Sequence, residues 1–377
     1  MKKITPPILA ALALLSACAK VETAPSSPES RVISFSPVLG SVRTKADTKT
    51  GEGSYPAINT KADPTAAQLD ERANFYSYAW YLPDGKIWDN NKADAKLYID
   101  KAEVAYHQAA VSPFVEKSWH ADQVYYWPKG GSLTFLSYSC LSGVKFYPDA
   151  FKPQNGIETK TTVDKDGLKI ENFYLSGADF DLLVADIAKD RRANLNGVPT
   201  LFRHKLARIS FYVNTEEKSG QTQDKYVLKS LKLTNIYKQG DYSGGGYDND
   251  AWSMRKEKND YSIFNDGDGQ QPIDVSTDFK PVGSYVMVIP QNLLATGRNE
   301  TDAWRETPQI IISYTKNGKD QPDITRNLET LGTNYWDKGK EYKYYITFGS
   351  GDNPINFSGS IGDWKDEDNS GVDIGTK

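Results

Sequence analysis

Residues that could carry out catalysis or bind a metal are few in this sequence of 377 residues, and their spacing matches no common site. The three histidines are His107, His120 and His204, and no two of them have the spacing of a metal-binding pair on a helix. Cys140 would need an activating base to act as a nucleophile, and the sequence places none beside it. We therefore predict that the protein is not an enzyme, that Cys140 is a buried and inert thiol on a strand, and that His204 is structural.

Acidic clusters offer a second kind of chemistry, the binding of calcium through oxygen ligands. Asp366 and Asp368 are spaced like the first half of a calcium-binding loop, but the twelfth position is Lys377 instead of a glutamate. Two shorter acidic runs, 248–250 and 266–268, are smaller candidates of the same kind. We expect all three to be solvated turns or tails, so neither a metal nor a cofactor is predicted. Two carboxylates suited to glycoside hydrolysis would leave no spacing in the sequence, and nothing supports them here.

The clearest chemical signal lies at the beginning of the sequence. Two lysines precede an apolar run over residues 8–15, and small residues then lead to Cys18, as in a secretory signal peptide. The ending Leu-Ser-Ala-Cys resembles the bacterial lipobox, in which the cysteine thiol receives a diacylglyceryl group and becomes the mature N-terminus. The apolar run is shorter than the roughly 20 residues needed to span a bilayer. We predict a lipoprotein signal peptide over 1–17, lipidation (palmitate) at Cys18 and a flexible lipid-anchored tether over 18–31; an ordinary cleavable signal is the alternative.

Charge and cysteine content narrow the function classes further. The formal net charge is −4, and it becomes −6 when Lys2 and Lys3 are removed with the signal peptide, which argues against binding to nucleic acid or to anionic lipid by charge. The lipid on Cys18 would therefore supply the contact with the outer membrane. Of the two cysteines, lipidation uses Cys18 and leaves Cys140 without a partner, so no intramolecular disulfide is expected.

The pattern of apolar residues predicts an all-β protein with few, short helices. Aromatic residues make up 12% of the sequence, and apolar side chains alternate with other residues over 209–213 and 342–348, with the period of two that β-strands show. The run 181–185 is continuously apolar, as in a strand buried on both faces. Several short strands at this spacing suggest β-sandwiches. We predict two of them, an N-terminal domain over 32–192 and a C-terminal domain over 193–377.

Seven short phrases are spread over nearly the whole mature chain. They are Ile-Ser-Phe-Ser-Pro (33–37), Val-Tyr-Tyr-Trp-Pro (124–128) followed by Leu-Thr-Phe-Leu-Ser-Tyr-Ser (133–139), Asp-Leu-Leu-Val-Ala (181–185), Leu-Phe-Arg-His-Lys-Leu-Ala-Arg-Ile-Ser-Phe (201–211), Val-Ile-Pro-Gln (288–291), Gly-Lys-Glu-Tyr-Lys-Tyr (339–344) and Ile-Gly-Asp-Trp (361–364). In this order the chain resembles the fimbrillin-like proteins of Bacteroidales, relatives of the FimA and Mfa pilins. The resemblance implies two transthyretin-like β-sandwich domains in tandem, export as a lipoprotein to the cell surface, and a place in type V pili as a tip, accessory, anchor or stalk subunit.

The resemblance also implies how such a subunit is assembled. In this family a protease cuts after a basic residue in the loop behind the first strand, that strand leaves, and a strand of another subunit fills the vacated groove. The leaving strand would consist here of Val32, Ile33, Ser34 and Phe35. Pro37 would limit its length, and the best cleavage position is Arg43 before Thr44, with Lys45 and Lys49 as alternatives. The other possibility is that the loop is only exposed and that this strand belongs permanently to the core.

The expected partners are other pilus subunits, the outer membrane through the lipid on Cys18, and, for an adhesive subunit, glycans or proteins of host or microbial cells. Residues 354–361 are typical of a strand, but the acidic tail after Trp364, from Asp366 to Asp373, is poorly suited to strand pairing, which disfavours a polymerising stalk subunit. The alternative function is a surface glycan-binding lipoprotein that acts with an outer-membrane uptake system and uses exposed tryptophan and tyrosine side chains.

Overall fold

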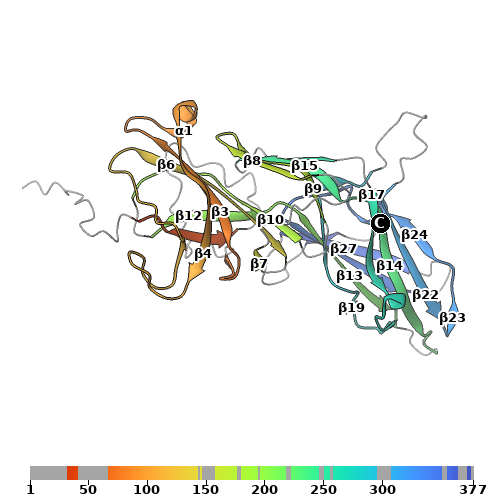
Figure 1. Cartoon of the computed structure of the whole chain (residues 1–377). Coiled ribbons are helices and arrows are strands. Elements are labelled where there is room, and N and C mark those ends of the chain that lie inside the picture. The colour runs from red at the N-terminus through yellow and green to blue at the C-terminus, as the bar shows by residue number, and fades with distance from the viewer. Residues whose placement is uncertain are drawn as a thin grey trace, which may run out of the picture.

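The computed structural model describes residues 32–40, 67–142, 145–146, 158–175, 180–193, 196–217, 222–245, 250–254, 258–294, 307–349, 355–363 and 372–374. Nearly all regular structure in this part of the chain is β-strand, and its α-helix, α1 (Trp88–Asn91), has only four residues. Short 3₁₀ turns occur at η3 (Lys92–Asp94), η4 (Asp266–Asp268) and η5 (Leu328–Leu331). The predicted all-β class is therefore confirmed, and Figure 1 shows the strands gathered into two lobes.

The first lobe contains a ten-stranded sheet that closes on itself. Its strands are β1 (Phe35–Leu39), β2 (Ala67–Gln68), β3 (Phe75–Leu82), β4 (Lys96–His107), β5 (Ser118–Ala121), β6 (Ser132–Ser142), β7 (Lys145–Phe146), β10 (Phe180–Ala185), β11 (Ala188–Arg191) and β12 (Val198–His204). Their order is β10-β12-β1-β5-β4-β3-β6-β11, with β2 beside β1 and β7 beside β6. An additional pairing of β10 with β6 closes the ring. Buried rings such as Phe75, Phe135 and Phe202 fill the enclosed space, which we call the ring core.

A four-stranded sheet covers the outer face of this ring where β3, β6 and β10 lie. It consists of β8 (Lys160–Asp164), β9 (Gly167–Tyr174), β15 (Gln239–Gly244) and β16 (Ala251–Met254), in the order β16-β15-β9-β8. Two of these strands precede β12 in the sequence and two follow it, so this shared sheet joins the two halves of the chain (Figure 1). Leu168, Ile170 and Phe173 of β9 pack beneath it in one cluster with Trp80 and Tyr138 of the ring.

Strand β6 explains why parts of the sequence are apolar without a break. Leu133 and Phe135 belong to the ring core, whereas Leu136, Tyr138 and Cys140 belong to the cluster under the shared sheet. Since successive side chains of a strand point to opposite faces, both faces of β6 are buried. The prediction that Cys140 is a buried thiol on a strand is confirmed, since its side chain is 2% exposed. Burial, and then the charge of Asp181, raise the pKa of the thiol well above its ordinary value.

The second lobe consists of two six-stranded sheets packed face to face. One contains β13 (Ala207–Thr215), β19 (Lys280–Pro281), β20 (Val286–Val288), β26 (Lys340–Phe348), β27 (Ile355–Asp363) and β28 (Val372–Ile374); the other contains β14 (Tyr226–Tyr237), β17 (Lys258–Asn265), β18 (Ile273–Asp274), β22 (Gln309–Lys316), β23 (Lys319–Asp320) and β24 (Ile324–Asn327). The short strands β21 (Gln291–Asn292) and β25 (Tyr335–Trp336) pair with each other in a separate two-stranded sheet. The predicted alternation over 209–213 and 342–348 is found in β13 and β26, whose inward residues form one core with those of β14 and β22.

The sheets change further along the chain than the predicted boundary between residues 192 and 193. β12 pairs with β1 and β10 of the first lobe, and the second lobe begins with β13 at Ala207. Lys189, Asp190 and Arg191, directly before the predicted boundary, lie in β11, which pairs with β6. By strand pairing, residues 198–204 belong with the first lobe; the division into independently folding units stays a prediction.

Phe173 offers a test of the shared sheet. Its ring is 1% exposed and meets Trp252 of β16 edge-on, with the ring centroids 5.2 Å apart. Phe173→Ala is expected to lower the free energy of unfolding by about 3–5 kcal/mol, because it opens a cavity in the core that joins the two halves. Glu171→Ala, on the exposed face of the same strand, should change it by less than about 0.5 kcal/mol. Denaturant unfolding followed by tryptophan fluorescence measures both, and equal losses would contradict the assignment.

Candidate functional site

The candidate site is the first strand, β1, together with the strands that hold it. β1 runs parallel to β12, from Phe35 opposite Val198 to Leu39 opposite Phe202. On its other side it pairs antiparallel with β5 at Phe35 and with β2 at Val38 and Leu39. β1 is thus an interior strand of the ring, and its removal would leave the facing edges of β12 and β5 without their partner.

The bounds of this strand differ from the predicted 32–35, because the strand runs through Pro37 to Leu39. The carbonyl of Ser34 and the N–H of Gly40 both bond to the β12 side, at 2.7 and 2.9 Å. Since hydrogen bonding alternates between the two neighbours along a strand in a parallel pair, Pro37 faces the opposite side. There the pairing with β5 ends before Pro37 and the pairing with β2 begins after it. The missing N–H of Pro37 therefore interrupts no ladder.

The side chains of β1 and of the residues before it fill the ring core. The ring of Phe35 meets Phe75 and Phe135 edge-on, with centroids 5.6 and 5.9 Å apart. Ile33, which is 2% exposed, belongs to the same core, and Leu39 packs against it. Burial of one such side chain contributes about 1.5–3 kcal/mol. A chain that lost β1 would expose an apolar groove, and a replacement strand would have to fill it.

Three basic residues follow directly after the part of β12 that holds β1, and all of them are buried. Arg203 is 3% exposed and donates two hydrogen bonds of 2.9 Å to the carboxylate of Asp186, in the turn between β10 and β11. His204 is 6% exposed, and its Nδ1 lies 2.7 Å from Oδ2 of Asp181 on β10. The structural role predicted for His204 agrees with this place, at the end of a strand instead of its start.

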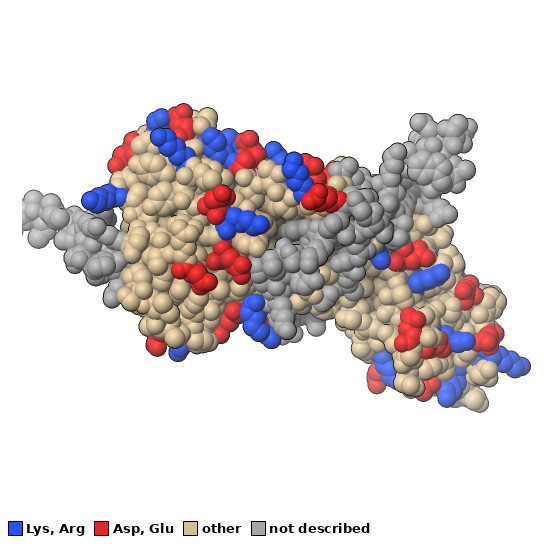
Figure 2. All heavy atoms as spheres, in the orientation of Figure 1, with Lys and Arg blue, Asp and Glu red and all other residues tan. Residues whose placement is uncertain are grey.

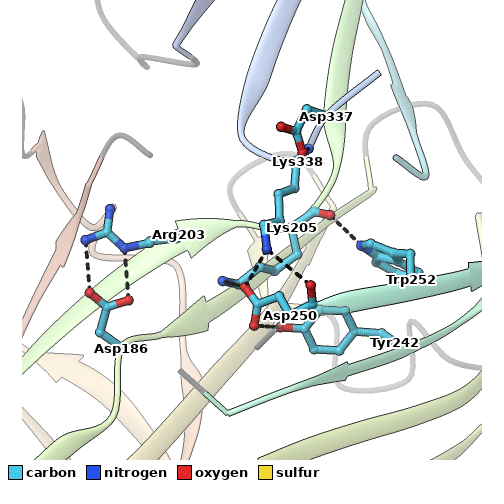
Figure 3. A network of polar contacts seen from close by, with 8 residues as sticks. All are labelled: Asp186, Arg203, Lys205, Tyr242, Asp250, Trp252, Asp337 and Lys338. Carbon is cyan, nitrogen blue, oxygen red and sulfur yellow. Dashed lines mark hydrogen bonds and ion pairs between the residues drawn. The ribbon is translucent and has the colours of Figure 1, made fainter. Parts of the chain in front are cut away.

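Lys205, the third of these residues, lies in a polar network at the junction of the lobes (Figure 3). Its ammonium contacts the carboxylate of Asp250, and their side chains are 4% and 1% exposed. Tyr242 donates a hydrogen bond of 3.0 Å to the same carboxylate, Lys338 Nζ lies 3.3 Å from it, and Trp252 donates to the Lys205 carbonyl at 2.8 Å. Burial lowers the pKa of Lys205, and the charge of Asp250 opposes that shift. Burial, and then the charge of Asp250, raise the pKa of the Tyr242 hydroxyl well above its ordinary value, so it stays a donor.

Asp250 corrects one sequence expectation, since it was assigned to a solvated turn and is instead buried against Lys205. The other acidic run, 266–268, does form the short turn η4. Among the described residues no group of three or more His, Cys, Asp or Glu side chains is arranged to hold a metal ion. The remaining predicted positions lie outside the described residues: Cys18, Arg43, Thr44, Lys45, Lys49, Asp248, Asp366 and Asp368.

The stretch 201–211 contributes to the family resemblance, but its sequence does not predict the roles of Arg203 and Lys205. The available signal was a run of three basic residues enclosed by Leu201 and Leu206, because consecutive charges within an apolar stretch must be paired where they are buried. The identity of the acidic partners could not be read in the same way, since Asp250 lies 45 residues away in sequence.

The other two histidines form a stack with an aromatic ring at the β4–β5 connection. His120 lies between Phe114 and His107, with ring centroids 3.7 and 3.8 Å away and interplanar angles of 2° and 9°. Burial, and the proximity of His107, lower the pKa of His120, which the backbone carbonyl of Ala121 and the charge of Asp122 partly oppose. The ring is therefore held as a neutral imidazole, which suits packing better than catalysis.

This stack predicts a dependence of stability on pH. Because the folded-state pKa of His120 is lowered from its ordinary value of 6.5, the unfolded chain binds more protons near that pH. The contribution of His120 is fully present above pH 6.5 and is lost as the pH falls below it. His120→Phe, which keeps a ring against Phe114, should flatten this slope between pH 7 and about 5. Thermal unfolding over this pH range measures the effect, and an identical slope in the variant would contradict the assignment.

The close approach of β1 to the residue before β12 predicts that two glycine-to-alanine substitutions differ in their effect on stability. Gly197, which precedes β12, has a φ of 77°, and a Cβ there would lie 2.9 Å from the carbonyl carbon of Phe35. Gly85 has a similar φ of 81° with open space around it. Gly85→Ala should therefore cost only the left-handed backbone penalty of about 1–2 kcal/mol. Gly197→Ala should cost more and should speed hydrogen exchange of the β1 amides, measured by mass spectrometry; equal behaviour of the two variants would show that Gly197 does not fit β1 to β12.

No helix of the described residues is long and apolar enough to span a membrane. A search of curated proteins found no match for the chain. Among solved structures, a fimbrial protein from Bacteroides vulgatus has a TM-score of 0.56 at 18% identity and covers 89% of this chain and 100% of its own. A candidate cell adhesion protein from Bacteroides uniformis has a TM-score of 0.45 at 14% identity and covers 89% of this chain and 98% of its own. The profile of the fimbrillin-like family matches residues 86–364, which is more than half of the sequence. The resemblance seen in the sequence is thereby confirmed, and the chain belongs to the fimbrillin-like family.

Proposed function

We propose that this protein is a non-enzymatic structural subunit of cell-surface fimbriae, exported as a lipoprotein through Cys18 and assembled by exchange of β1 for a strand of another subunit. Membership of the fimbrillin-like family supports the fimbrial role. The observation that carries strand exchange is the place of β1, which is an interior strand of the ring and whose covalent connection to β2 runs through residues 41–66. That connecting segment contains Arg43 and Thr44, the proposed cleavage position.

Cleavage between Arg43 and Thr44 would change how β1 is held. The strand would lose its covalent link to β2, and only non-covalent contacts would retain it: the five-residue register with β12, the shorter pairings with β5 and β2, and the packing of Phe35. The lipid on Cys18 belongs to the same leaving segment. In this proposal the lipid delivers the subunit to the outer membrane and is discarded when the subunit joins a fimbria.

The groove defines what an incoming strand must provide. A strand that copies the pairing of β1 would have an extended backbone parallel to β12, and alternate side chains would be apolar to replace Phe35 against Phe75 and Phe135. A gap in pairing near the position of Pro37 is tolerated. Backbone bonds would supply the affinity and the apolar pockets the specificity, as in strand addition to a sheet edge.

The surface and the tryptophans support a structural partner over the alternatives. Basic and acidic side chains are interspersed over the face shown in Figure 2, which does not suit nucleic acid. The glycan-binding alternative uses exposed tryptophan and tyrosine rings. Tyr98, Tyr126 and Tyr335 are exposed, but five tryptophans are buried: Trp80, Trp88, Trp119, Trp127 and Trp336. Other fimbrial subunits are therefore the proposed partners, and glycans or proteins of other cells are proposed only as targets of the assembled fimbria.

The N-terminus of the protein in purified fimbriae tests this proposal. We expect a start at Thr44 without lipid in the fimbrial fraction and a start at lipidated Cys18 in the membrane fraction. Arg43→Ala should keep the protein in the membrane fraction. Lys49→Ala, in the same segment, serves as the matched control and should be processed normally. Fimbriae in which residues 41–47 remain intact would overturn strand exchange, while leaving membership of the family untouched.

A further inference from the structure

The junction of the lobes contains a lysine and an aspartate that are enclosed together. The side chains of Lys205 and Asp250 are in contact and are 4% and 1% exposed. Lys205 lies between β12 and β13, and Asp250 directly precedes β16 of the shared sheet. The main chain of Lys205 is fixed on both sides, because its N–H donates to the Leu182 carbonyl at 2.8 Å and its carbonyl accepts from Trp252 at 2.8 Å.

The surroundings of the Asp250 carboxylate are polarised and closely packed. Tyr242 donates a hydrogen bond of 3.0 Å to Oδ1, and Lys338 Nζ lies 3.3 Å from Oδ2 (Figure 3). Gly244 leaves the space for this arrangement, since a Cβ there would lie 2.2 Å from Asp250 Oδ1 and 2.3 Å from the Tyr242 hydroxyl oxygen. A buried amine thus touches a carboxyl group whose two oxygens each face a separate proton donor.

We propose that Lys205 and Asp250 condense to form an intramolecular amide cross-link, which ties the connection between the lobes to the shared sheet. A proton passes from the Lys205 ammonium to Oδ2 of Asp250. The neutral amine then attacks Cγ of the protonated carboxyl group, and the N–C bond forms as the bond from Cγ to Oδ2 breaks. Oδ2 leaves as one water molecule with two of the three protons of the original ammonium. The atoms balance without an oxidant or a reductant.

Each neighbour has a defined part in this reaction. The hydroxyl of Tyr242 faces Oδ1, where negative charge develops in the tetrahedral intermediate. The ammonium of Lys338 faces Oδ2, so it can give a proton to the departing oxygen and recover one from the Lys205 nitrogen. Burial favours the product, because two charges that are expensive to keep away from water are replaced by a neutral amide. The lowered pKa of Lys205 agrees with this direction.

Peptide mapping of the full chain tests the cross-link without any substitution. Trypsin cannot cut after a lysine whose side chain is acylated, so residues 204–208 should remain one peptide. We expect it joined to peptide 239–255, with a mass equal to the sum of the two minus one water. Separate peptides, with cleavage after Lys205 and no linked species in denatured protein, would overturn the proposal. A loss of water that maps within peptide 239–255 alone would also overturn it, because it would indicate dehydration of an aspartate by its own backbone.

Variants place the reaction at these residues. Lys205→Arg keeps the charge and should abolish the linked peptide, and Asp250→Ala should do the same. Asp186→Ala is the matched control, because it disturbs the neighbouring pair with Arg203 and leaves Lys205, Tyr242 and Asp250 in place; the linked peptide should persist in it. In newly synthesised chains, Tyr242→Phe should slow formation by about 100-fold, as loss of one oxyanion donor does elsewhere. A linked peptide in Lys205→Arg would overturn the assignment.

Discussion

The pairing of three consecutive buried residues, Arg203, His204 and Lys205, with acidic side chains is the constraint on which the arrangement of the lobes depends. Removing one partner of a buried ion pair typically costs about 3–5 kcal/mol, since the other charge is left without compensation. The three acids come from different places: Asp181 from β10, Asp186 from the turn after it, and Asp250 from the start of β16. Folding must therefore bring all of these elements around residues 203–205 before the buried side chains have their acidic partners.

The ring has an apolar outer face that must be kept from water, and the shared sheet covers it. Strands β3, β6 and β10 carry large side chains on both faces, and an uncovered outer face would expose Trp80, Tyr138 and their neighbours. Strands β9 and β15 cover it, one from each side of the 203–205 stretch in sequence. The first lobe is thus completed by residues of the second half of the chain, and its stability is linked to the contacts at the junction.

The parts of this fold that depend on local periodicity were predictable, and those that depend on distant pairing were not. β13 and β26 follow from alternation of apolar residues, and β10 from a run buried on both faces. The continuation of β1 through Pro37 could not be predicted from the sequence. Only the pairing on each side of β1 shows that the absent N–H of Pro37 interrupts no hydrogen bonding. Asp250 was taken for a solvated residue because nothing near it in sequence reveals a buried lysine 45 residues away.

β12 connects the two features that matter most for the proposed assembly. Its residues 198–202 hold β1, and the next three residues in the chain are buried Arg203, His204 and Lys205. A strand from another subunit placed in the groove would bond to the same backbone, so tension between subunits would pass along β12 to Arg203 and Lys205. The bidentate pair of Arg203 with Asp186 and the contact of Lys205 with Asp250 resist that tension at the point where it leaves the first lobe. Together with the proposed cross-link, these contacts would hold the connection between the lobes where tension in the proposed fimbria leaves the first lobe.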